Sequence, residues 1–118
     1  MLQQIEKIVA EDPSYKFEAY SFVMAGLHDT VSRLSKPRHV TGKELCQGLK
    51  DYALEQFGPL TRTVLEFWGI QKTRDFGKIV FNLIKAELLK KTEEDSIDDF
   101  NQVYDFAQAF QYEIKEDS

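Results

Sequence analysis

Polar side chains suited to binding an anion recur at helical spacing near the middle of the chain: Arg74, Lys78, Asn82 and Lys85. On a helix turning by about 100° per residue, the four fall within roughly 80° of one another. Arginine and lysine contact phosphates, and an asparagine amide can reach a base edge. Phe81 lies among these residues as an apolar anchor, and Lys90 and Lys91 follow in sequence. The region therefore predicts a binding surface for a partner.

The residue types needed for catalysis are scarce, with two histidines and one cysteine in the chain. His28 lies at the edge of a predicted apolar stripe and His39 follows a Pro-Arg linker, and such histidines more often donate hydrogen bonds than act as bases. Cys46 lies beside the apolar side of a predicted helix and is expected to be a small buried hydrophobe. We therefore expect no enzyme, no cofactor and no metal site.

One long helix is needed to align the basic residues, and it is predicted over residues 73–88, running into a basic, extended end. Thr73 is the expected N-cap, and Asp75 suits the positive end of the helix dipole. Gly77 costs about 1 kcal/mol of helix propensity relative to alanine, so it predicts a close approach of another helix. The opposite side of this helix is apolar: Phe76, Ile79, Val80, Leu83 and Ile84.

A short helix over residues 60–68, ending at Gly69, precedes the central helix. Two helices joined by a glycine-containing turn form the helix-turn-helix pattern. The stretch LLKKT could then pair with residues 103–106 as a β-ribbon, which would place the central helix in the recognition position of a winged helix. Plain packing of helices in a small α domain is the alternative.

Three further helices are predicted upstream, over residues 2–11, 15–34 and 42–57. The last begins at a capping box made by Thr41 and Glu44 and ends at Gly58. His39-Val40 could add a one-bridge strand before it. The predicted fold is mainly α, a winged-helix-like domain of about five helices, and the pattern leaves a small β-ribbon open.

The 118 residues fit one domain, 1–118, and a hydrophobic fraction of 42 % with nine Phe predicts a sizeable core. Tyr104, Phe106 and Phe110 are expected to dock on it. No apolar run is long enough to span a bilayer, and the first residues do not resemble a signal peptide. A cytoplasmic protein that does not bind membranes is predicted.

Charge is distributed unevenly along the chain. Residues 1–35 carry −2, residues 36–91 carry +5 and residues 92–118 carry −8, within a net charge of −5. A basic middle followed by an acidic end indicates either an anionic partner or pairing within the chain. In the second case, the acidic segment would fold over the basic one and screen it.

Six short stretches carry a resemblance to a known family: HVTGKEL, ALEQFGPL, FWGI, DFGKIVFNLI, LLKKTEEDSIDDF and a later YDF. Through them, residues 39–106 resemble a family of small bacterial proteins of unknown function. The resemblance implies a cytosolic, non-catalytic domain. It supplies no ligand, activity or site residue.

The sequence therefore predicts a non-enzymatic, cytosolic interaction module that binds a protein partner through its basic helix face. The alternative is a winged-helix-type protein that binds nucleic acid through the same residues. An acidic overall composition counts against that alternative, because DNA-binding domains are usually strongly basic. The partner's identity and the oligomeric state stay open.

Overall fold

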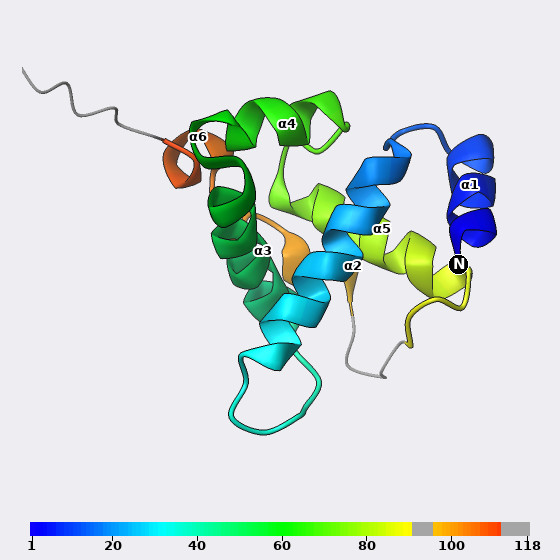
Figure 1. Ribbon diagram of the computed structural model, residues 1–118, viewed down its shortest axis with the longest axis horizontal. Helices are drawn as coiled ribbons and strands as arrows, with labels where there is room; N and C mark the ends of the chain where they lie inside the picture. Colours follow the sequence, from blue (N-terminus) through cyan, green and yellow to red (C-terminus); the bar gives the residue numbers. More distant parts are fainter. Residues whose placement is uncertain (91–95, 112–118) are drawn as a thin grey trace, which may run out of the picture.

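Helices make up most of the part of the chain that the structure, a computed structural model, describes: residues 1–90 and 96–111 (Figure 1). Five helices have seven residues or more in that part: α1 (Leu2–Glu11), α2 (Phe17–Ser32), α3 (Gly42–Phe57), α4 (Thr61–Phe67) and α5 (Thr73–Lys85). Shorter helical segments are η1 (Gly58–Leu60), η2 (Ile97–Phe100) and α6 (Phe106–Ala109). The prediction of a mainly α domain with about five helices is confirmed.

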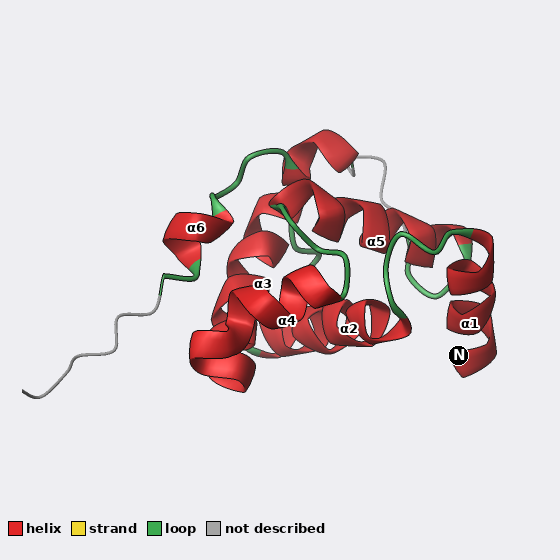
Figure 2. Cartoon of the chain, turned by 90° about the horizontal axis from the view of Figure 1, so that it is seen from above, coloured by secondary structure: helices red, strands yellow, loops and turns green. Residues whose placement is uncertain are grey.

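The core lies where α2, α3 and α5 meet, with α2 crossing in front of α5 in Figure 1. Tyr20, Leu49 and Phe76 contribute one fully buried side chain from each of these helices. Viewed from above, helices and loops account for every described segment (Figure 2). None of the helices in residues 1–90 and 96–111 is long and apolar enough to cross a membrane.

Local capping signals set the boundaries of α3 and α4. Glu44 N donates to Thr41 Oγ1 at 3.1 Å and Thr41 N donates to Glu44 Oε1 at 3.1 Å, so the predicted capping box is confirmed. Gly58 ends α3 with a φ of 51°. Gly69 ends α4 with a φ of 97°, and Ile70 N donates to Leu65 O at 2.9 Å across this turn.

The turn at Gly69 also packs against the α1–α2 connection. A Cβ at this position would lie 2.3 Å from the carbonyl oxygen of Ser14, which excludes any side chain. Beside it, Lys16 N donates to Trp68 O at 3.1 Å. The glycine therefore allows the turn between α4 and α5 to pack directly against the α1–α2 connection.

The predicted β-ribbon is wrong for the described residues, which contain no strand in 1–90 or 96–111. The central helix ends at Lys85 instead of residue 88, because Glu87 turns left-handed with a φ of 62°. Leu88 N donates to Leu83 O at 2.9 Å and closes this end of the helix. On the other side of the expected ribbon, Phe106 begins α6.

Two further local predictions fail. His39-Val40 forms no bridge. Thr73 does not cap α5. Lys72 is the N-cap residue, and the Thr73 hydroxyl is hydrogen-bonded to the C-terminal segment instead. Its Oγ1 donates to Phe100 O at 2.6 Å and accepts from Val103 N at 3.2 Å, so it binds the C-terminal segment to the start of α5.

Phe100 enters the space that Gly77 leaves open. A Cβ on Gly77 would lie 2.8 Å from the Phe100 ring, and one on Gly42 would lie 2.8 Å from the same ring. The predicted close approach at Gly77 is therefore real, and the approaching element is η2. The expected docking of the later aromatics is confirmed as well: Phe106 and Phe110 are buried, and Tyr104 Oη donates to Cys46 O at 2.7 Å.

Candidate functional site

The predicted basic face of α5 is only partly open. Arg74 is held by the C-terminal segment, with Nη1 at 2.6 Å from Asn101 Oδ1 and 3.4 Å from Asp98 Oδ1. Asn82 Nδ2 donates to the hydroxyl of buried Tyr20 at 3.1 Å. Lys78 and Lys85 are exposed. Two of the four residues in the stripe therefore stabilise the fold instead of facing solvent.

Acidic side chains at the C-terminal end of α1 lie beside the open part of this face. Glu11 and Asp12 share a cleft of about 390 Å³ with Asn82 and Lys85. The Ser14 hydroxyl and N–H donate to Asp12 and hold the pKa of that carboxyl below its usual range, with smaller contributions from Asn82 and Lys78. Asp12 therefore stays ionised and weakens the positive field that an anion would meet.

Part of the proposed screening by the acidic segment is present, since Asp98 contacts Arg74. The Asp98 side chain is 76 % exposed, so this ion pair contributes little. Lys91 and the acidic residues 93–95 and 113–117 lie outside the described residues, and so does the part of the prediction that depends on them.

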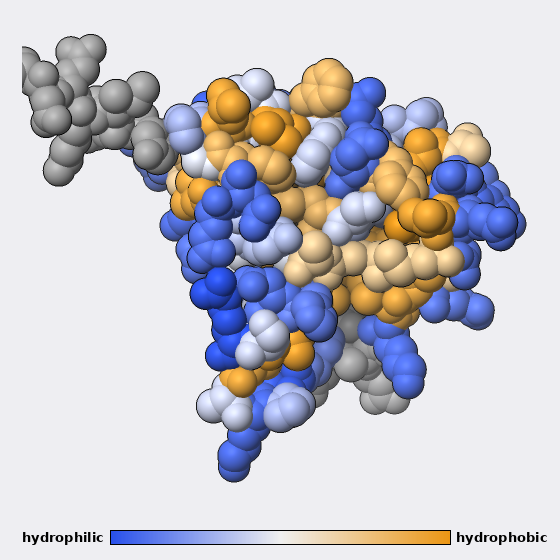
Figure 3. All heavy atoms as spheres, in the orientation of Figure 1, coloured by the Kyte–Doolittle hydropathy of each residue, from blue (hydrophilic) through white to orange (hydrophobic). Residues whose placement is uncertain are grey.

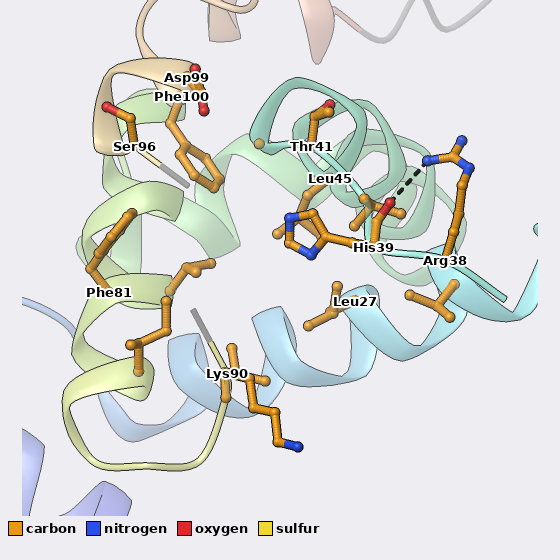
Figure 4. Close-up of a pocket in the computed structure, with 16 residues that line it drawn as sticks. Leu27, Arg38, His39, Thr41, Leu45, Phe81, Lys90, Ser96, Asp99 and Phe100 are labelled. Carbon is orange, nitrogen blue, oxygen red and sulfur yellow. Dashed lines mark hydrogen bonds between the residues drawn. The ribbon is translucent and has the colours of Figure 1, made fainter. Parts of the chain in front are cut away.

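The clearest cavity on the described part of the chain lies between α2, α3, α5 and η2, and we call it the α2–α5 pocket. Its volume is about 240 Å³. In Figure 4, Phe81 lies on the α5 side and His39 on the opposite side. Of the predicted binding residues, Phe81 and Lys90 line this pocket and the other described ones do not. Its apolar lining residues are Leu27, Val31, Val40, Leu45, Val80, Phe81, Ile84, Leu89 and Phe100.

Hydrogen bonds hold the polar wall of the α2–α5 pocket in place. The two terminal nitrogens of Arg38 lie 3.0 Å and 2.7 Å from the Glu44 carboxylate oxygens. Arg38 Nη1 also donates to His39 O at 3.0 Å (Figure 4). Arg38 and the Thr41 N–H lower the pKa of Glu44 to about 2. One carboxylate thus caps α3 and fixes the segment before it, so the pocket wall is preformed.

The volume of the pocket limits what it can hold. Pockets for drug-sized ligands and cofactors measure about 300–1,000 Å³, whereas an apolar cavity of about 150 Å³ holds benzene. At about 240 Å³ the α2–α5 pocket has room for one bulky side chain or ring. Nine of its lining residues are apolar, which favours an apolar occupant.

The candidate catalytic residues do not assemble into a site. Cys46 is fully buried, and desolvation raises the pKa of its thiol to about 12, so the predicted inert role fits. His28 lies exposed on α2, and His39 lies on the loop before α3. Within residues 1–90 and 96–111, no group of three or more His, Cys, Asp or Glu could hold a metal ion.

A second surface, on η1 and α4, was not predicted from the sequence. Leu60 is 61 % exposed and Phe67 is 69 % exposed, with half-buried Val64 between them. Beside them, α2, α3 and α4 form a shallow aromatic hollow lined by Phe17, Phe22, Tyr52, Phe57 and Trp68. Figure 3 shows apolar residues over α4 and the neighbouring part of α2. The sequence predicts Val64, Leu65 and Trp68 on the inner side of this helix; Leu65 is buried, and Val64 and Trp68 are half-buried.

No family model matches the chain, and neither a curated protein nor a solved structure matches it. The resemblance to a family of small bacterial proteins therefore stays a prediction.

Proposed function

We propose that this protein is a non-enzymatic, cytoplasmic interaction module that takes one bulky apolar side chain of a partner protein into the α2–α5 pocket. The observation that carries the proposal is a preformed, mainly apolar cavity of about 240 Å³ with Phe81 in its wall. A buried anchor side chain in such a pocket supplies much of the affinity of a protein interface.

The proposal modifies the expectation drawn from the sequence. Phe81 becomes part of the receiving wall instead of a protruding anchor. Lys90, exposed at the edge of the pocket, would meet a polar or acidic group next to the partner's anchor. Binding through Lys78 and Lys85 to nucleic acid is the weaker alternative, because Arg74 and Asn82 are already hydrogen-bonded within the chain.

A peptide selection with a matched control tests the proposal. A phage-displayed peptide library would be selected on the full chain and counter-selected on Val31→Phe, which fills the pocket from α2. Recovered peptides should share one bulky apolar residue and bind Val31→Phe at least about tenfold more weakly. Val9→Phe, the same change at a half-buried valine on α1, should keep full binding.

Two results would contradict the proposal. Selected peptides could lack a common apolar residue, or they could bind the filled variant as well as the original protein. Circular dichroism of Val31→Phe and Val9→Phe would confirm that both stay folded, so that a loss of binding is attributable to the pocket.

A further inference from the structure

The lining of the α2–α5 pocket divides into an apolar interior and a polar mouth. Its apolar lining residues are all buried or half-buried, whereas those with charged or polar side chains are all exposed. The residues of the mouth are Arg38, His39, Thr41, Lys90, Ser96 and Asp99. A partner's side chain that fills the interior therefore brings the neighbouring residues of the partner over these polar groups.

Two residues of the mouth carry charges that no other described residue neutralises. Arg38 is paired with Glu44, so these two side chains together have no net charge. By contrast, neither the Lys90 ammonium nor the Asp99 carboxylate forms an ion pair or hydrogen bond with another residue in the described part of the chain. One base and one acid are therefore available to a partner at the mouth.

The available base and acid lie apart from each other. Lys90 follows the end of α5, and Asp99 lies in η2. Figure 4 shows them at opposite ends of the pocket, with Phe81 and His39 at intermediate positions. The mouth is therefore positive at the Lys90 end and negative at the Asp99 end.

We propose that the α2–α5 pocket selects a partner segment whose apolar anchor lies between an acidic and a basic residue, with the acid at Lys90 and the base at Asp99. This selectivity rests on the proposed function, because the anchor in the pocket positions both flanking residues. Complementary charges at an interface suppress wrong partners and fix the direction in which a segment lies. A segment with two acids would be repelled at Asp99, and one with two bases would be repelled at Lys90.

Peptide selections on charge variants test this selectivity. The probe is a phage-displayed library in which a central leucine, phenylalanine or tryptophan has randomised residues on both sides. Selected on the full chain, it should yield acids on one flank and bases on the other. Lys90→Glu should change the preference of the acidic flank to basic residues and leave the other flank unchanged, and Asp99→Lys should do the converse. Both positions are exposed, so the fold should be retained.

The affinity of one selected peptide, made synthetically, gives a second measurement. Reversing the charge of its acidic residue should weaken binding to the original protein about two- to fivefold at low salt, the size expected of an exposed ion pair. The same reversal should strengthen binding to Lys90→Glu. Fluorescence anisotropy measures both. Lys85→Glu, the same change at an exposed lysine of α5 outside the pocket, is the matched control and should behave as the original protein.

Failure of this selectivity can be distinguished from failure of the proposed function. Peptides that lose binding to Val31→Phe, but whose flanking charges do not respond to Lys90→Glu or Asp99→Lys, would overturn the selectivity alone. Equal effects of Lys85→Glu and Lys90→Glu would also overturn it, since the net charge of the protein would then explain both. Peptides that bind Val31→Phe as well as the original protein would overturn the proposed function, and the selectivity with it.

Discussion

Helices α4 and α5 are consecutive in the chain, yet other segments of the chain contact the outward side of α5 and leave that of α4 exposed. The polar stripe of α5, which periodicity assigns to solvent, is held at Arg74 and Asn82 by other parts of the same chain. Beside α4, by contrast, the apolar side chains of Leu60 in η1 and Phe67 in α4 stay exposed. Periodicity tells which residues share a side of a helix, and only tertiary contacts tell what covers that side.

The largest expected effect comes from removing the side chain that covers α5. Phe100→Ala should lower the free energy of unfolding by about 3–5 kcal/mol, because a buried ring is lost between Gly42 and Gly77. Gly77→Ala should cost about 1–3 kcal/mol in the original protein through overpacking. In the Phe100→Ala background, the same change should cost less, because the ring carbons are gone and only the Cβ of residue 100, 2.9 Å away, still crowds the new methyl group. Urea denaturation of the four proteins gives this coupling, and additive effects would contradict the contact.

The two sides of α4 provide the next test. Leu65→Ala on the inner side should cost about 2–5 kcal/mol, because Leu65 is fully buried. Phe67→Ala on the outer side should change stability by no more than about 0.5 kcal/mol in dilute solution. Thermal or urea unfolding at low micromolar concentration measures both. Similar costs at the two positions would show that the outer side of α4 is covered within one chain.

The stripe on α5 can be divided in the same way. Asn82→Ala should cost about 1–3 kcal/mol, because it removes a hydrogen bond to the buried Tyr20 hydroxyl. Lys78→Ala, one turn away and exposed, should stay within about 0.5 kcal/mol. If both substitutions were neutral, the stripe would be an open surface after all, and nucleic-acid binding would regain support.

The smallest effect concerns Glu44, an exposed carboxylate held by Arg38 and the α3 cap. The pKa of Glu44 in the folded protein is about 2, below the ordinary 4.5. The ionised carboxylate therefore contributes fully to folding stability above pH 4.5, and this contribution is lost as the pH falls toward 2. The stability difference between the original protein and Glu44→Gln should therefore shrink over this interval. A difference that stayed constant from pH 6 to about pH 2 would rule out the carboxylate as its source.

Helix positions could be predicted largely because their signals are local. The capping box of Thr41 and Glu44 and the turn glycines Gly58 and Gly69 act within a few residues, and each was found where expected. Thr73 shows where such reasoning fails. Its hydroxyl could accept a hydrogen bond from the helix backbone as an N-cap, but it accepts one from the N–H of Val103, 30 residues away in sequence, instead.

The candidate site was harder to predict for the same reason. Phe81 could be identified as unusual among basic residues, but the pocket beside it is assembled from α2, α3, α5 and η2. The ribbon expected after α5 depended on the helix continuing past Lys85, and Glu87 ends it in a conformation that non-glycine residues seldom adopt. No short-range sequence signal predicts either the pocket or the early end of α5.

The attachment of Phe100 to α5 has a consequence for the order in which the protein folds. While the chain is being synthesised, α1 to α5 can form before residues 97–110 exist. Until then, the Thr73 hydroxyl lacks its carbonyl and the gap between Gly42 and Gly77 is unfilled. Stalled nascent chains ending before residue 97 should therefore be protease-sensitive around α5, and release of the last aromatic segment should complete the domain in one cooperative step.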